Sequence, residues 1–189
     1  MAFEDYQTKE SVVVVYTGEG KGKTSASVGL MARALGTGFR VAFIQFIKHW
    51  EVGEHKFIHQ IEPVFGDKLY FYKGGKGFYN AGDLSAKNVS DADHKLAAKE
   101  TFKKAYQSSI SGKFDLVICD EINNAVHDGL LDLSDLEKLI DDKNSKTSLC
   151  LTGRNFNLKL IDKVDIVSEI TKIKHHFDNK YLANKGIDF

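Results

Sequence analysis

The fold is decided by the stretch Val12-Val13-Val14-Val15-Tyr16-Thr17-Gly18-Glu19-Gly20-Lys21-Gly22-Lys23-Thr24. The β-branched run predicts a buried strand, because such side chains suit a sheet that is covered on both faces. The glycines that follow let backbone N–H groups turn toward an anion. A helix that begins at the end of the loop directs its partly positive N-terminus at the same point. The stretch therefore predicts a phosphate-binding loop.

The side chains of this loop suit a nucleotide and its metal ion. Lys23 supplies a full positive charge, and the Thr24 hydroxyl is a candidate magnesium ligand. The general pattern has glycine where Thr17 stands, and glycine follows one residue later. The alternative is a glycine-rich strand–helix turn that binds nothing. The candidate nucleotide-binding residues of the loop are Thr17, Gly18, Glu19, Gly20, Lys21, Gly22, Lys23, Thr24 and Ser25.

Composition narrows the class of protein. The chain has 189 residues, with 26 Lys and Arg and 26 Asp and Glu side chains, so its formal net charge is zero. Overall charge therefore gives no reason to expect nucleic acid or a membrane surface as partner. No apolar run approaches the roughly 20 residues that span a bilayer, and residues 1–10 show no signal-peptide core. We expect one cytoplasmic domain over residues 1–189. Cys119 and Cys150 are expected to be packed thiols, with a disulfide or metal pair as the alternative.

Strand and helix patterns alternate along the chain. This alternation predicts an α/β fold, with a mostly parallel sheet, helices on both faces and a phosphate-loop NTPase-like (RecA-like) architecture. Helices are predicted at residues 23–35, 90–110, 123–128 and 134–141, the last with Ser134 as its N-cap. The long helix is expected to bury Ala92, Leu96, Ala97, Phe102, Ala105 and Tyr106. Strands are predicted at residues 11–17, 39–47, 68–72, 115–119, 147–151 and 165–168.

Charged residues follow several of the predicted strands. The carboxylates of Asp120 and Glu121 come directly after an apolar strand, where they are candidates to support magnesium; a helix cap with a solvated charge is the alternative. Arg154, in the segment after the next strand, is a candidate phosphate contact or an exposed arginine. Lys48, which follows another predicted strand, either reaches the carboxyl edge of the sheet or is solvated. Since ligands of such sheets bind at the carboxyl ends of the strands, we expect these groups near Thr24.

Aromatic and histidine residues offer two further candidates. Phe78 and Tyr79 lie in a glycine-rich loop, where exposed rings could cover a flat, apolar ligand. Lys174-His175-His176 could contain a metal pair, although adjacent side chains on an extended segment point apart.

The motifs together resemble the corrinoid adenosyltransferases that act in cobalamin synthesis and salvage. The resemblance spans nearly the whole chain, and the Thr-Gly start of the phosphate loop is typical of that family. Besides the loop, the matching motifs are Arg33-Ala34-Leu35-Gly36-Thr37-Gly38, Gln45-Phe46-Ile47-Lys48, Gly53-Glu54, Gly77-Phe78, Asp120-Glu121, Thr152-Gly153-Arg154, Val167-Ser168-Glu169, Lys174-His175 and Gly186-Ile187-Asp188-Phe189.

The resemblance implies transfer of the 5′-deoxyadenosyl group of ATP to the cobalt(I) of a reduced corrinoid, with triphosphate as the leaving group. It implies Mg²⁺ or Mn²⁺, an electron donor such as a flavoprotein, and a homodimer. Cobalt(I) is itself the nucleophile, so the protein must position the 5′ carbon and stabilise the leaving group. The implied roles are catalysis by Lys23, Thr24 and Glu121, metal support by Thr24, Asp120 and Glu121, and nucleotide contact by Arg33 and Arg154.

The family's lower-face corrinoid loop has a counterpart in Phe78, Tyr79 and Asn80, which we predict to bind the corrinoid. Asn80 stands where the family has tryptophan. Either Tyr79 takes over the displacement of the lower cobalt ligand, or the corrinoid needs little displacement. Two other functions fit parts of the sequence. A phosphate-loop kinase or ATPase fits the loop and the paired acids, and a non-catalytic ATP or corrinoid-binding module fits the change at Asn80.

Overall fold

A computed structural model describes residues 6–77, 79 and 89–189. Its centre is a six-stranded sheet with the order β3-β2-β4-β5-β1-β6, in which every neighbouring pair is parallel. This arrangement confirms the predicted α/β class. The strands are β1 (Val13–Thr17), β2 (Val41–Gln45), β3 (Leu69–Lys73), β4 (Leu116–Asp120), β5 (Ser148–Thr152) and β6 (Ile166–Glu169).

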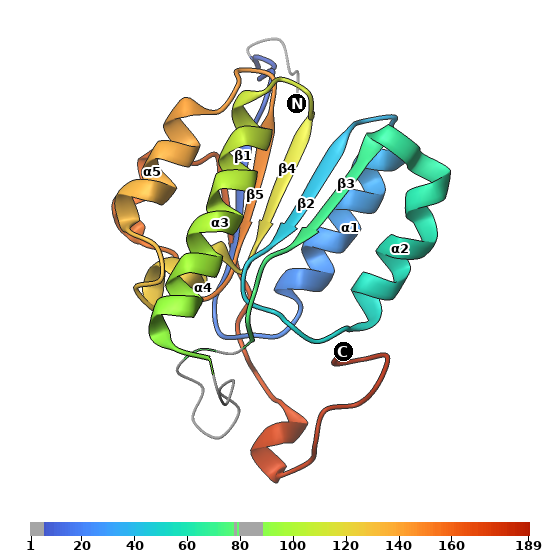
Figure 1. Ribbon diagram of the computed structural model, residues 1–189, viewed down its shortest axis with the longest axis vertical. Helices are drawn as coiled ribbons and strands as arrows, with labels where there is room; N and C mark the ends of the chain where they lie inside the picture. The colour runs from blue at the N-terminus through green and yellow to red at the C-terminus, as the bar shows by residue number, and fades with distance from the viewer. Residues whose placement is uncertain (1–5, 78, 80–88) are drawn as a thin grey trace.

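Helices cover both faces of the sheet (Figure 1). One face carries α1 (Lys23–Gly36) and α2 (Gly53–Phe65), and the other carries α3 (Asp91–Ile110), α4 (Ile122–His127) and α5 (Leu133–Asp142). Side chains of β2 alternate between the two cores: Ala42 and Ile44 pack with the α3–α5 side, whereas Phe43 packs with Met31 of α1. Short 3₁₀ turns occupy Gly66–Lys68, Leu158–Lys163 and His176–Asn179.

Strand order brings the predicted site residues to one edge. β5 lies between β1, which leads into the phosphate loop, and β4, which ends in Asp120. Tyr16 is in register with Thr152, and Gln45 is in register with Asp120. Parallel strands end on the same side of a sheet, so these residues share the carboxyl edge.

The face that α3 buries agrees in part with the predicted one. Ala97 and Ala105 are buried, and Phe102 and Tyr106 are partly buried against the core, as predicted. Leu96 is 59% exposed and Ala92 is also exposed, so the prediction is wrong for these two residues. The other buried residues of the helix are small or polar, namely His94, Ala98, Thr101, Ser108 and Ser109.

Two other helices differ from the sequence prediction. α5 begins at Leu133 and its N-cap is Asp132, not Ser134; the Asp132 N–H donates to Asp135 Oδ2 over 3.0 Å. The sequence patterns predict no helix at α2, which contains Pro63 near its end. The strand predicted at residues 165–168 is confirmed as β6, an edge strand whose four residues are all exposed.

The two cysteines are free and buried in neighbouring strands, which confirms that they are packed thiols. Burial raises the pKa of both Cys119 and Cys150, so neither favours the reactive thiolate. Among the described residues, no helix is long and apolar enough to cross a membrane.

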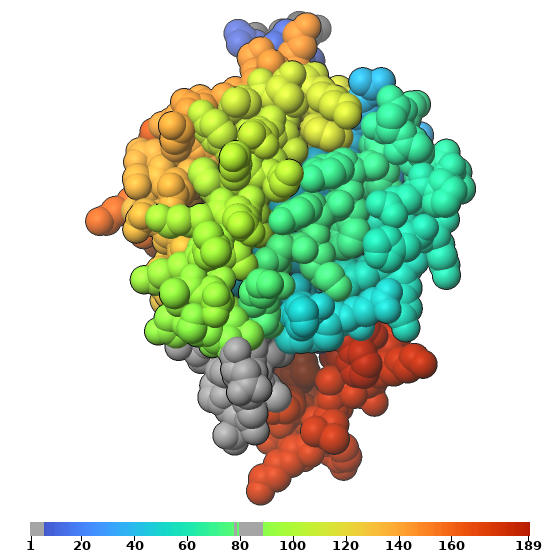
Figure 2. Space-filling model, viewed as in Figure 1, coloured from blue at the N-terminus to red at the C-terminus, as the bar shows by residue number. Residues whose placement is uncertain are grey.

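The segment after β6 runs past the carboxyl edge of the sheet and projects from the body of the domain, in red in Figure 2. Its first residue, Ile170, donates its N–H to the Thr17 carbonyl over 2.8 Å. The chain therefore places its C-terminal residues beside the phosphate loop.

Replacing Leu151 with alanine tests the core assignment. Leu151 is fully buried in β5, so Leu151→Ala should lower the free energy of unfolding by about 2–5 kcal/mol. Leu158→Ala is the matched control, because Leu158 is 70% exposed and should change the value by less than about 0.5 kcal/mol. Urea denaturation measures both. Equal losses for the two variants would contradict the described core.

Candidate active site

The phosphate loop is pressed against the chain that leaves β6. A Cβ atom at Gly18 or Gly20 would lie 2.6 or 2.5 Å from the Ile170 carbonyl oxygen, too close for any side chain. The Gly20 N–H donates to that same oxygen over 2.6 Å. Gly22 has a φ of 112° and is the N-cap of α1, without a capping side chain. The first N–H groups of α1 therefore remain available to an anion.

Lys23 spans this loop. Its Nζ donates to the carbonyl oxygens of Gly18 and Gly20 over 2.6 and 2.7 Å. Burial and the nearby Arg154 guanidinium lower the pKa of Lys23, although Glu121 and Glu19 oppose the shift. The ammonium group thus sits inside the loop, as a phosphate-binding lysine does.

Asp120 is the most completely bound polar group at the edge. Its side chain is fully buried and accepts three hydrogen bonds. Thr152 Oγ1 donates to Oδ1 over 2.7 Å, while Gln45 Nε2 and Thr24 Oγ1 donate to Oδ2 over 2.7 and 3.2 Å. Thr24 and Asp120 are therefore together, as the sequence predicted.

Glu121 lies next to this group in a strained backbone conformation. Its φ of 65° is in the left-handed region, where few residues other than glycine lie, and its N–H donates to Thr152 Oγ1 over 2.9 Å. Burial and the neighbouring Asp120 carboxylate raise the pKa of Glu121 to about 7, with Lys48 opposing them. Strain and a perturbed pKa together are typical of functional positions.

Lys48 also reaches the edge. Its Nζ lies 2.6 Å from Glu54 Oε1 and 3.4 Å from Thr24 Oγ1, and its side chain is only 15% exposed. Burial disfavours its charge, but Asp120, Glu121 and Glu54 outweigh that effect and raise the pKa of Lys48. The alternative of a solvated lysine is excluded.

Sequence reasoning missed two buried residues behind Asp120. Gln45 is fully buried, and His55, near the start of α2, is 1% exposed. His55 Nε2 and Gln45 Oε1 are 2.5 Å apart. Burial and Lys73 lower the pKa of His55 to about 4, so this histidine is neutral at physiological pH. Gln45 begins the Gln45-Phe46-Ile47-Lys48 motif, but no pattern in the sequence pairs it with a histidine ten residues later.

Of the other predicted nucleotide contacts, Arg154 and Lys21 lie at the loop and Arg33 does not. Arg154 Nε lies 3.2 Å from Glu19 Oε2 at an exposed position beside the loop. Lys21 Nζ pairs with Asp188 Oδ1 over 2.7 Å, which ties the loop to the C-terminal segment. Arg33 is in the last turn of α1, about 15 Å along the helix from Lys23 at about 1.5 Å per residue, so the structure does not bring it to the loop.

Thr17 and Ser25 flank the loop. Thr17 Oγ1 accepts the Phe156 N–H over 3.2 Å, which joins the end of β1 to the segment after β5. Ser25 is exposed in the first turn of α1.

The corrinoid prediction is only partly within the described chain. Tyr79 is half-buried, with its ring centroid 5.1 Å from that of His94, so it packs on α3 instead of standing exposed in its loop. Phe78 and Asn80 lie outside the described residues.

His176 belongs to the segment that the sequence offered as a possible metal pair. Its Nε2 is 3.1 Å from the Leu182 carbonyl oxygen and 3.4 Å from Asp188 Oδ2.

The oxygen atoms at the edge suit Mg²⁺. Within residues 6–77, 79 and 89–189, no three His, Cys, Asp or Glu residues are grouped to hold a metal by themselves. Mg²⁺ commonly binds through one or two carboxylates, with phosphate oxygens and waters completing its octahedron. The Thr24 hydroxyl and the Asp120 carboxylate, in contact beside the loop, fit that donor set.

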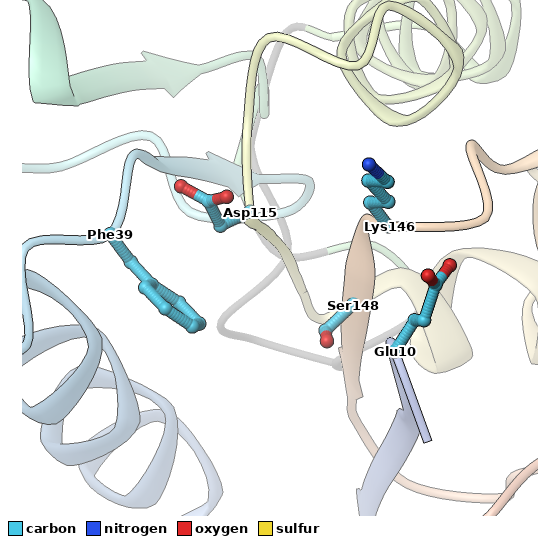
Figure 3. A pocket seen from close by; sticks show the side chains of 5 residues that line it. All are labelled: Glu10, Phe39, Asp115, Lys146 and Ser148. Atoms are coloured by element: carbon cyan, nitrogen blue, oxygen red, sulfur yellow. The ribbon is translucent and has the colours of Figure 1, made fainter. Parts of the chain in front are cut away.

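A surface hollow at the other end of the sheet is a different feature. Figure 3 shows the side chains that line it, which precede or begin the strands: Glu10, Phe39, Asp115, Lys146 and Ser148. Asp115 and Ser148 accept the N–H groups of Arg40 and Val12, so they serve the strand ends.

Comparison with known proteins identifies the family. Residues 9–189 match the family described as ATP:corrinoid adenosyltransferase BtuR/CobO/CobP. The chain belongs to this ATP:corrinoid adenosyltransferase family. Three curated relatives are each called "Corrinoid adenosyltransferase". The Sinorhizobium sp. protein is 32% identical over 96% of this chain and 81% of its own. The Pseudomonas aeruginosa protein is 31% identical over 96% of this chain and 85% of its own. The Escherichia coli K12 protein is 30% identical over 97% of this chain and 88% of its own.

A solved structure supports the fold of this corrinoid adenosyltransferase family member. The flagellar accessory protein FlaH from Methanocaldococcus jannaschii superimposes with a TM-score of 0.51, over 85% of this chain and 71% of its own. The two sequences are 13% identical, so the likeness concerns architecture alone.

The pH dependence of unfolding tests the environment of Glu121. Because the folded state raises this pKa to about 7, ionisation destabilises the fold as the pH rises from the unfolded value of 4.5 through 7. Glu121→Gln removes the penalty and should stabilise the metal-free protein by about 3 kcal/mol at pH 8 and by much less at pH 5. Thermal unfolding in EDTA measures the difference.

Glu100→Gln, at an exposed position on α3, removes a carboxylate outside the site and serves as the control. A stabilisation by Glu121→Gln that is larger at pH 5 than at pH 8 would contradict the described burial of this carboxyl group.

Proposed function

We propose that the chain carries out the reaction of its family at the carboxyl edge of the sheet, with Lys23, Thr24, Asp120 and Glu121 as its core residues. The reaction transfers the 5′-deoxyadenosyl group of ATP to the cobalt(I) of a reduced corrinoid. Cobalt donates an electron pair to C5′, the cobalt–carbon bond forms, and the C5′–O bond breaks with its pair on the departing triphosphate. The observation that carries this assignment is the contact between the loop threonine and the buried Asp120.

The loop residues would stabilise the leaving group. Negative charge grows on the triphosphate as the C5′–O bond breaks, and preorganised donors stabilise it most effectively. Lys23 lies inside the loop on two carbonyl oxygens, which a phosphate oxygen can replace as partners. The free N–H groups at the start of α1 add further donors.

The acidic residues would hold the divalent cation. When bound, Mg²⁺ or Mn²⁺ neutralises part of the triphosphate charge. Thr24 and Asp120 would ligate it, and Glu121 would support it directly or through water. Glu121 has a raised pKa in the free protein, so a nearby cation would favour its ionised form.

The cations around the loop would complete the nucleotide site. Arg154 and Lys21 are held at the loop by Glu19 and Asp188, and both are partly exposed. Either can exchange its carboxylate partner for phosphate, a ligand that suits an arginine fork in particular. On the family resemblance alone, we propose Thr17 and Ser25 as further nucleotide contacts at the loop and Arg33 as a nucleotide contact away from it.

The remaining proposals rest on the resemblance as well. Phe78, Tyr79 and Asn80 would line the lower face of the corrinoid. An electron donor such as a flavoprotein would supply cobalt(I), the enzyme would act as a homodimer, and it would work in the cytoplasm.

Replacing Lys23 with alanine tests the assignment. Lys23→Ala should lower kcat/KM for adenosylation by at least about 100-fold, because one charged donor to the leaving group is lost. The assay combines ATP, Mg²⁺ and chemically reduced cobalamin without oxygen, and follows the cobalt–carbon product by visible spectroscopy. Lys103→Ala, an exposed lysine on α3, is the control and should keep full activity.

The nucleotide product separates the rival functions. Triphosphate supports the transferase, whereas ADP and phosphate would identify a kinase or ATPase. Full turnover by Lys23→Ala would contradict the role of the loop, and tight binding of ATP and corrinoid without any product would favour the non-catalytic module.

A further inference from the structure

We propose that Gln45 and His55 are positioning residues that fix the orientation of the Asp120 carboxylate for the divalent cation. This inference rests on the proposed function, since it assigns these residues to the same site. Neither side chain reaches the loop in the described structure; both act through Asp120.

The three side chains form one buried chain of hydrogen bonds. His55 lies beside Gln45, with Nε2 2.5 Å from the amide oxygen, and Gln45 Nε2 donates to Asp120 Oδ2 over 2.7 Å. The relative exposures of His55, Gln45 and Asp120 are 1%, 0% and 0%. Sheet register places Gln45 directly beside Asp120, whereas His55 comes from α2.

The direction of every hydrogen bond is set by a backbone group. The Val52 N–H donates to His55 Nδ1 over 3.2 Å, and this N–H can only donate. Nδ1 of the neutral ring is therefore the acceptor, and Nε2 carries the proton and donates to the Gln45 amide oxygen. The amide must then present its NH₂ group to Asp120. One orientation of the amide satisfies both neighbours, so the relay also excludes the flipped amide.

The opposite oxygen of the carboxylate is fixed separately. Thr152 donates to Oδ1, and its hydroxyl oxygen accepts the Glu121 N–H, which sets its direction as well. A carboxylate has about four lone-pair sites, and Thr152, Gln45 and Thr24 occupy three of them. The relay thus prevents rotation of Asp120 and leaves a defined position for an additional ligand.

A purely structural role does not explain this choice of residues. The buried Asp120 carboxylate needs a donor such as Gln45, but that need alone does not call for a second buried polar side chain, His55, which adds its own desolvation cost and fixes the direction of the Gln45 amide. Partners that orient a metal ligand are a common use of such networks, and their loss typically weakens metal affinity by about 10–100-fold.

The test compares metal affinity in two disrupting variants and two controls. Gln45→Leu and His55→Phe keep the bulk of the side chain but remove its polar atoms. His55→Gln retains a donor that can reach Gln45, and Ser109→Ala removes an unrelated buried hydrogen bond, to the Tyr106 carbonyl. Binding of Mn²⁺ to the nucleotide-free protein is measured by the loss of the free Mn²⁺ EPR signal, without ATP because ATP itself chelates the ion.

The expected result is Mn²⁺ affinity about 10–100-fold weaker in Gln45→Leu and His55→Phe, with His55→Gln and Ser109→Ala within about 3-fold of the unaltered protein. Equal affinity in all folded variants would overturn the positioning role alone. Absence of Mn²⁺ binding by the unaltered protein would overturn the metal site and this role with it.

A second measurement needs no variant to fold. ¹⁵N NMR of the unaltered protein without ligands at pH 7 should show the His55 ring with an unprotonated Nδ1 and a protonated Nε2. The opposite tautomer, or a rapidly exchanging mixture, would break the direction of the relay and overturn the proposal.

Discussion

The site depends on one buried carboxylate. Asp120 is fully buried at the end of a central strand, where an ion without partners would cost several kcal/mol. Hydrogen bonds from Thr152, Gln45 and Thr24 offset that cost, and these donors come from β5, β2 and α1. Asp120 therefore connects three elements of the sheet edge, and the phosphate loop can be placed correctly only when all three are in register.

The same edge shows a balance of charge. Lys23 and Lys48 face Asp120 and Glu121, and each of these lysines already has an oxygen partner in the free protein. A nucleotide with its metal ion brings both signs of charge, so it can replace partners without leaving a buried charge uncompensated. The strained backbone at Glu121 and its raised pKa are consistent with a site organised for a ligand more than for stability.

The C-terminal segment is part of the loop's surroundings. The Ile170 carbonyl fills the space that a side chain at Gly18 or Gly20 would need, and Asp188 pairs with Lys21. Glycine is therefore required in this loop for two physical reasons. It lets backbone N–H groups turn toward a phosphate, and it leaves room for the chain that leaves β6. The second reason is visible only because residues 150 positions apart in the chain are in contact.

The sequence by itself determined the strand, loop and helix around Lys23, the α/β class, and the position of Asp120 at a strand end, because local patterns of β-branched residues and glycines encode them. Tertiary structure alone decided the small-residue face of α3, the exposure of β6, the pairing of Lys21 with Asp188, and the relay through Gln45 and His55. These features depend on strand order and on contacts between distant segments, and no periodicity along the chain records which side chains meet across a sheet.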